Sequence, residues 1–201
     1  MSIFNIINVR NSLKNMTDEY FESFLPKFAE KLHNYGFEEL LQYYNKNLKD
    51  DWHNLQKKKI DKDWINATSI TGMNLIKKNM PHIYEVRNYK GKSIKKMWTL
   101  ENIKKVLRTN RKSHSTPYIS EIIRQLGFTA GTSKVTIYRP LLTKRIVESL
   151  EAKNVLDVCV GWGGRMLGTR SLKNTSYTGI EPYTKTYNGL MKMKTDLKLE
   201  N

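Results

Sequence analysis

The chain has 201 residues, of which 39% are hydrophobic, and its 35 Lys and Arg residues against 19 Asp and Glu residues give a formal net charge of +16. It contains no run of about 18 apolar residues and no pattern typical of a signal peptide, so we expect an intracellular protein with no membrane partner. Its one cysteine, Cys159, excludes an internal disulfide and a cysteine-rich zinc site.

Residues 17–48 have the pattern of helices. Thr17 can act as an N-cap, acidic residues follow in the first turn, and large apolar residues recur at helical spacing. Pro26 is expected to kink or restart the helix, and Gly36 to separate it from a second helix. The aromatic residues of this stretch favour a hydrophobic core over a surface that stacks bases.

Residues 49–98 alternate lysines with aromatic residues, among them Trp64 and Tyr89. This pattern suits phosphate contact combined with base stacking, but solvated lysines beside core aromatic residues give the same string. The secondary structure of this stretch is hard to assign from the sequence, although we expect the basic segment 51–134 as a whole to be mainly helical.

Two short helices are clearer further along this segment. Thr99 is expected to cap a helix that runs through Leu107. Thr116 and Pro117 are expected to start a second helix, which Gly127 ends. The polar, basic connection between the helices is too long for a tight helix-turn-helix, so we interpret the pair as a DNA-facing unit without a motif match.

The positive charge is concentrated in the middle of the chain. Residues 1–50 carry 6 Lys/Arg against 7 Asp/Glu, residues 51–134 carry 18 against 6, and residues 135–201 carry 11 against 6. Because phosphate contacts by Lys and Arg release condensed counterions, this segment favours a nucleic-acid partner, with DNA expected. A general bias of composition towards lysine and asparagine would give the same excess. The candidate nucleic-acid contacts are Lys95, Lys96, Lys104, Lys105, Arg108, Arg111 and Lys112.

Two motifs elsewhere fail. Gly91-Lys92-Ser93 ends like a phosphate-binding loop, but Val86 stands where that pattern requires glycine. The four histidines show no metal-ligand spacing with acidic residues or with Cys159, so no metal site is predicted.

The most informative stretch is "NVLDVCVGWGGRMLG", Asn154 to Gly168. Its first seven residues have the pattern of a buried parallel strand, and a glycine-rich turn leads into a helix that begins at Gly164. For a dinucleotide the pattern requires Gly-x-Gly-x-x-Gly, but the last position holds Met166. The pattern that fits is Asp-x-x-x-Gly-x-Gly, from Asp157 to Gly163.

A second strand and helix follow. Residues 177–180 are expected to form a strand that ends on Glu181, where a carboxylate can accept both ribose hydroxyls of a nucleoside. Upstream, Arg139-Pro140 lies just before an amphipathic helix and ahead of the first strand. We therefore predict the start of an α/β domain at residues 135–201, after a near-neutral helical region at 1–50 and the basic region at 51–134.

Together these features resemble the class I S-adenosylmethionine-dependent methyltransferases that act on amino groups of DNA bases. Asp157 to Gly163 is similar to their motif I, Glu181 to their ribose-binding acid, and residues 138–140 to their motif X. The "GWGGR" loop after a helical region resembles DNA methylases of large DNA viruses and phages. The resemblance implies the beginning of a Rossmann-like sheet, incomplete in this chain, with S-adenosylmethionine as the cofactor.

The resemblance also implies roles for individual residues. The glycines would let the backbone approach the cofactor, and Asp157 would face its cationic methionine end. Residues 138–140, which match motif X, would cover that end. The implied cofactor-binding residues are Tyr138, Arg139, Pro140, Asp157, Val158, Cys159, Gly161, Trp162, Gly163, Gly164, Glu181 and Pro182.

The family's catalytic motif, Asp/Asn/Ser-Pro-Pro-Tyr/Phe, is absent from these 201 residues, which contain no Pro-Pro pair. Ser115 to Tyr118, "STPY", is only faintly similar to it. We therefore predict no catalytic residue, and expect a downstream segment or a second chain to complete the domain.

Two function classes stay open. One is the first part of an adenine-N6 or cytosine-N4 DNA methyltransferase, with RNA as a variant substrate; the other is a basic nucleic-acid-binding protein with an incomplete or vestigial cofactor fold.

Overall fold

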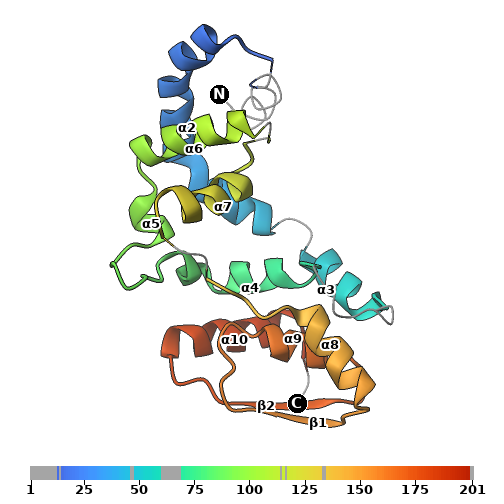
Figure 1. Cartoon of the computed structure of the whole chain (residues 1–201). Coiled ribbons are helices and arrows are strands. Elements are labelled where there is room, and N and C mark those ends of the chain that lie inside the picture. The colour runs from blue at the N-terminus through green and yellow to red at the C-terminus, as the bar shows by residue number, and fades with distance from the viewer. Residues whose placement is uncertain are drawn as a thin grey trace. The chain divides into compact units, whose positions relative to one another are not determined.

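The computed structural model is mostly helical, with one short parallel sheet near the carboxyl end (Figure 1). It describes residues 13, 15–45, 48–59, 69–113, 115, 117–132 and 135–199. Trp64 and Thr116 lie outside the described residues. No helix in the described part combines the length and the apolar character that crossing a membrane requires.

The chain divides into two compact units, each built from two separate stretches. The first unit comprises Met1–Tyr43 and Tyr84–Val135, and the second comprises Tyr44–Ile83 and Thr136–Asn201. The basic segment predicted at 51–134 is therefore shared between them. The two units are defined by which residues pack together, and the distribution of charge along the sequence does not indicate this packing.

The described secondary-structure elements of the first unit are all helices. Its core is formed by apolar residues that are at most 2% exposed, including Phe28, Leu32, Ile103, Leu107 and Ile122. Each of these lies on the inward stripe of an amphipathic helix. Its described helices are α2 (Asp18–Asn45, of which Tyr44 and Asn45 belong to the second unit), α5 (Ile94–Met97), α6 (Leu100–Lys112) and α7 (Ile119–Thr129).

Helix α2 continues through both Pro26 and Gly36, so the predicted restart and the predicted separation into two helices are wrong. Gly36 instead provides space, because a Cβ at this position would lie 2.1 Å from the indole of Trp98. The same indole donates a hydrogen bond to the carbonyl of His33 at 3.3 Å. The glycine thus marks a close approach to another segment, which the local sequence does not distinguish from a helix break.

Two predicted N-caps are confirmed. The Thr17 hydroxyl accepts a hydrogen bond from the backbone N–H of Tyr20 at 3.3 Å, and the Thr99 hydroxyl accepts one from that of Asn102 at 3.4 Å. These bonds satisfy donors that have no partner inside the helix, which stabilises a helix start by about 1 kcal/mol.

Helix α7 differs from its prediction at both ends. It begins at Ile119, two residues after Pro117, and it runs through Gly127 instead of ending there. The residue beyond its end with a left-handed backbone is Gly131, at φ 62°. Gly127 is therefore an ordinary helical residue, and the glycine needed for the chain reversal lies four positions later.

The second unit combines the short sheet with helices from both parts of the chain. Strands β1 (Asn154–Asp157) and β2 (Ser176–Gly179) are parallel, with Asn154 opposite Ser176 and Asp157 opposite Gly179. In Figure 1 the helices of its carboxyl-terminal stretch lie on one side of this sheet. The helical elements are α3 (Leu48–Lys57), α4 (Met73–Asn79), η2 (Pro81–Tyr84, of which Tyr84 belongs to the first unit), α8 (Pro140–Ser149), α9 (Gly164–Arg170) and α10 (Thr184–Asp196).

The first strand lies where the sequence predicts it, but the prediction that it is buried is wrong. Leu156 is 68% exposed and Val158 is 71% exposed, and Ile180 beyond β2 is 55% exposed. Successive side chains of a strand alternate between faces, so these three lie on one face of the sheet. The described helices cover the opposite face, and this apolar face is open.

A buried lysine joins α3 to the rest of the second unit. The Lys144 ammonium on α8 donates hydrogen bonds to the carbonyls of Leu55, Gln56 and Lys58 at 2.7–3.0 Å. These carbonyls lie at the end of α3, where intrahelical partners are missing and a positive charge is favourable. Burial lowers the pKa of Lys144, and the nearby Glu148 carboxylate opposes that effect. The contact explains why residues 48–59 pack with residues far along the chain.

Candidate functional site

The two acids singled out in the sequence lie at the same edge of the sheet. Asp157 is the last residue of β1 and pairs with Gly179, two residues before Glu181. Between β1 and α9 the chain turns through Gly161 at φ 56° and Gly163 at φ 78°, a left-handed conformation that favours glycine. The carboxyl edge of a parallel sheet is where α/β folds bind their ligands.

The three glycines of this turn have different surroundings. A Cβ at Gly163 would lie 2.5 Å from the side chain of Leu190, and a Cβ at Gly164 would lie 1.9 Å from the carbonyl oxygen of Tyr138. A Cβ at Gly161 would meet nothing within 4 Å. Gly163 and Gly164 are therefore needed for packing, whereas Gly161 leaves an open stretch of backbone.

Asp157 is fully engaged by its own chain. Its carboxylate accepts two hydrogen bonds from the Arg165 guanidinium at 2.7 and 3.1 Å, one from the Tyr177 hydroxyl at 2.5 Å and one from the Cys159 backbone N–H at 3.2 Å. A carboxylate has about four acceptor positions, so all of them are used. The structure thus gives Asp157 different partners from the cationic methionine end that the family resemblance implies.

The pKa values of this cluster follow from the same contacts. Burial alone would raise the pKa of Asp157, but hydrogen bonds from Arg165 and Tyr177 outweigh it, so this pKa lies below its usual value. Burial and the adjacent Asp157 raise the pKa of Tyr177. The cluster is therefore an ionised carboxylate held by a guanidinium and a neutral phenol.

Glu181 retains capacity for a ligand. One of its oxygens accepts a hydrogen bond from the N–H of Gly161 at 2.8 Å, and the other accepts one from the N–H of Tyr183 at 2.9 Å. Two of about four acceptor positions therefore remain, one on each oxygen. The carboxylate is partly exposed and also fixes the open part of the glycine turn.

Aromatic residues lie at or next to the backbone N–H groups that bind this carboxylate. The ring of His82, on η2, lies 5.2 Å from that of Trp162 and 6.0 Å from that of Tyr183, centroid to centroid. The Nε2 of His82 also shares a 3.2 Å hydrogen bond with the hydroxyl of Thr186 on α10. His82 is not predicted from the sequence, because the histidines show no metal-ligand spacing and nothing local links residue 82 to residue 162.

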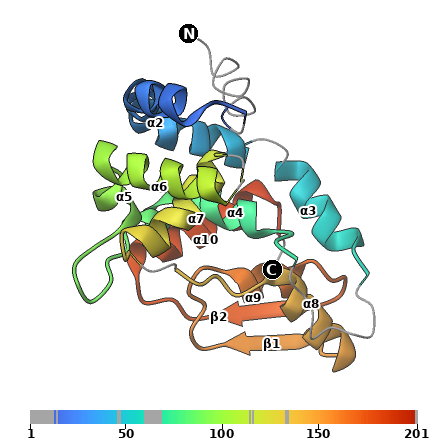
Figure 2. The same cartoon turned by 45° about the horizontal axis from the view of Figure 1, so that its top comes forward.

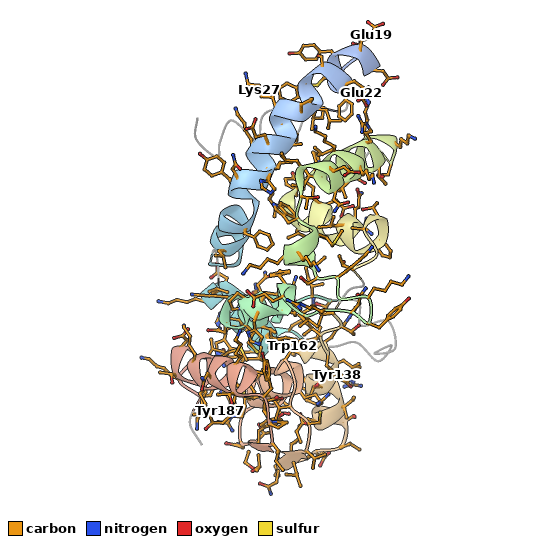
Figure 3. All side chains as sticks on the ribbon, turned by 90° about the vertical axis from the view of Figure 1, so that its left-hand side faces the viewer. Glu19, Glu22, Lys27, Tyr138, Trp162 and Tyr187 are labelled. Atoms are coloured by element: carbon orange, nitrogen blue, oxygen red, sulfur yellow. The ribbon has the colours of Figure 1, made fainter. Side chains whose placement is uncertain are left out.

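The segment before α8 packs on the start of α9. Pro140 is the first residue of α8, Arg139 occupies its N-cap position, and the ring of Tyr138 lies 5.4 Å from the guanidinium carbon of Arg165. Tyr138 and Trp162 thus come from different segments of one unit (Figure 3). The remaining predicted residues, Val158, Cys159 and Pro182, are exposed.

No family model, curated protein or solved structure matches this chain.

A wide hollow of about 620 Å³ lies at the opposite, amino end of the strands. Its lining includes Lys153, Lys173 and Ser176 and contains no residue of the glycine turn. Because ligands of parallel sheets bind at the carboxyl edge, this hollow is not the candidate cofactor site.

The predicted nucleic-acid residues divide into two groups. Four of them form ion pairs in the first unit: Arg108 with Glu22, Arg111 with Asp18, Lys95 with Glu85 and Lys105 with Glu101. Glu22 projects from α2 on the side of α6 (Figure 3). Lys96, Lys104 and Lys112 form no ion pair with described residues. The charges of those three are therefore not compensated by a described acid.

Proposed function

We propose that the second unit binds S-adenosylmethionine and forms the cofactor half of a methyltransferase for an exocyclic amine of a base in DNA. The observation that carries this proposal is the edge where β1 and β2 end, with a half-engaged carboxylate, Glu181, beside the open backbone of Gly161. A nucleoside fits such an edge because its two ribose hydroxyls are a pair of donors for one carboxylate.

The nucleoside part of the cofactor has candidate partners. The two unused acceptor positions of Glu181 suit the ribose hydroxyls, and Gly161 gives the ligand room beside the turn. The rings of Trp162 and Tyr183 offer flat apolar surfaces near the same carboxylate for the adenine base. The cofactor supplies an electrophilic methyl group, and these residues bind and orient it.

Asp157 acts indirectly in this proposal. Its carboxylate holds Arg165, which in turn lies against the carbonyl of Cys159 and the ring of Tyr138. Asp157 is therefore a positioning residue that shapes the turn and the segment before α8. The sequence contains no base-receiving Pro-Pro-Tyr motif, so binding of the cofactor and transfer of its methyl group are separate expectations for this chain.

Cofactor binding has a direct test at Glu181. Replacing it with glutamine removes the charge and one acceptor, so S-adenosylhomocysteine should bind roughly ten- to a hundredfold more weakly in calorimetry, the equivalent of about 1.5–3 kcal/mol for hydrogen bonds to a charged group. Glu101→Gln is the matched control, because it removes an exposed carboxylate in the first unit. Equal affinities for the original chain and both variants would contradict the cofactor proposal.

Nucleic acid is the proposed macromolecular partner because the first unit presents basic side chains without internal ion pairs. Changing Lys96, Lys104 and Lys112 to glutamine in the full chain should reduce the magnitude of the negative slope of log affinity against log salt by up to about 0.9 per lost phosphate contact. Fluorescence anisotropy with duplex DNA at several salt concentrations measures this slope.

A control for that measurement changes charge alone. The exposed residues Lys27, Lys49 and Lys173 can be replaced by glutamine. This lowers the net charge by the same amount as the triple substitution at 96, 104 and 112, but leaves those three lysines in place. This variant should alter the slope less. If both variants alter it equally, or if binding does not depend on salt, the basic charge reflects composition and not a binding surface.

A further inference from the structure

The loop between residue 84 and α5 holds an aromatic ring away from the protein. Tyr89 is 90% exposed, the highest fraction among the large hydrophobic side chains of the described residues. Figures 1 and 2 show this loop, in green, projecting from the helices of the first unit. Burying such a ring is favourable, so a ligand that covers it gains free energy.

The loop has a defined conformation. The side-chain oxygen of Asn88 accepts hydrogen bonds from the N–H groups of Lys90 and Lys92, both at 3.0 Å. The backbone closes the same turn, with Asn88 N–H donating to the Lys92 carbonyl and Gly91 N–H donating to the Asn88 carbonyl, both at 2.9 Å. Gly91 takes a left-handed conformation at φ 68°. The ring is therefore presented by an ordered turn.

The turn is also fixed to the end of α7. The Asn88 amide donates to the carbonyl of Gly131 at 2.7 Å, and the Lys92 ammonium donates to the carbonyl of Ala130 at 3.2 Å. On the last turn of α7, Phe128 is 73% exposed. Two exposed aromatic side chains thus lie on segments that are hydrogen-bonded to one another.

The charge around the ring is positive. The Lys90 ammonium lies 5.3 Å from the centre of the Tyr89 ring, and Arg87 is exposed on the same loop. Residues 85–96 contain five Lys or Arg residues and one acid, Glu85, which is paired with Lys95 at 2.6 Å. A ligand that covers the ring therefore meets cations and no uncompensated carboxylate from this segment.

We propose that the Asn88–Lys92 turn binds single-stranded nucleic acid, with the Tyr89 ring stacked on a base and Lys90 and Arg87 facing the neighbouring phosphates. Every base has a flat face, so stacking on a tyrosine is tolerant of sequence, and an ordered turn loses little conformational freedom on binding. This inference rests on the nucleic-acid part of the proposed function and is independent of the cofactor part.

The test uses the full chain and a fluorescent single-stranded oligonucleotide at low salt. Tyr89→Ala should weaken binding roughly five- to a hundredfold, the range for loss of one base–aromatic stack, whereas Tyr89→Trp should retain the affinity. Tyr187→Ala is the control, because it removes another exposed tyrosine, on α10 of the second unit (Figure 3). It should bind as tightly as the original chain.

A second ligand separates stacking from charge. On an oligonucleotide with abasic sites throughout, the original chain and Tyr89→Ala should bind equally, because the phosphates remain and the bases are gone. An equal loss on both ligands, or no loss with Tyr89→Ala, would overturn this inference alone. If the original chain binds no oligonucleotide even at low salt, the nucleic-acid part of the proposed function fails with it.

Discussion

Gly164→Ala should destabilise the second unit by about 3 kcal/mol or more, at or beyond the upper end of the cost of overpacking. The added methyl group would lie 1.9 Å from the carbonyl oxygen of Tyr138 and 2.8 Å from its carbonyl carbon. Both are backbone atoms, so no rotamer change can relieve the overlap, and α9 must move away from the segment before α8. Urea unfolding of the full chain measures the change in free energy.

Gly161→Ala is the control that separates steric overlap from the general cost of replacing a glycine in this turn. Its added methyl group meets nothing within 4 Å, so only the left-handed backbone, at φ 56°, opposes the change. A cost of about 1–2 kcal/mol is expected for a non-glycine residue in this conformation. If Gly161→Ala were as destabilising as Gly164→Ala, the close approach between α9 and Tyr138 would not be the cause.

Asp157→Ala is the second substitution with a large expected effect. It leaves the Arg165 guanidinium and the Tyr177 hydroxyl without their acceptor, and breaking a buried ion pair costs about 3–5 kcal/mol. Arg165 retains some access to water, so about 2–4 kcal/mol is expected here. Glu22→Ala breaks another arginine–carboxylate pair, with Arg108, but both side chains there are about half exposed. That control should cost much less than Asp157→Ala, because solvent screens an exposed pair.

Acid should reduce the stability that Asp157 contributes. Its pKa in the folded chain lies below the value of about 3.9 expected for an unfolded aspartate, because hydrogen bonds from Arg165 and Tyr177 outweigh burial. The contribution is therefore complete above that unfolded value and is lost as the pH falls through the folded pKa. The difference in unfolding free energy between the original chain and Asp157→Asn should shrink from pH 6 towards about pH 3. A constant difference would show that the carboxylate charge does not matter.

Local patterns in the sequence predict much of the carboxyl-terminal region. A hydrophobic run, clustered glycines and a return of helical spacing place a strand, a turn and a helix between Asn154 and Arg170, as the structure has them. The threonine caps at Thr17 and Thr99 are also local, since the bond runs to a residue three positions away. Such features depend on neighbours that the sequence displays directly.

The sequence alone does not predict features that depend on distant segments. Gly36 carries the same local signal as a helix break, but its space is taken by Trp98 from another segment. Val158 has the apolar character of a core residue, yet the face of the sheet that carries it is open. The partners of Asp157 could have been suggested by Arg165 on the first turn of the following helix, but the choice between that arginine and a ligand requires coordinates.

The Lys144 contact has a consequence for how the chain is made. Its hydrogen bond to Leu55 spans 89 residues, and the first unit's stretch 84–135 lies between the two partners. During synthesis, residues 48–83 therefore leave the ribosome long before the segment that caps α3 exists. Closing so long a loop is slow, and buried side chains such as Leu75 and Met80 stay uncovered in the meantime. Since α10 also packs on α4, we expect nascent chains that stop before α10 to be caught by chaperones through this stretch, and chains that include α10 to escape them.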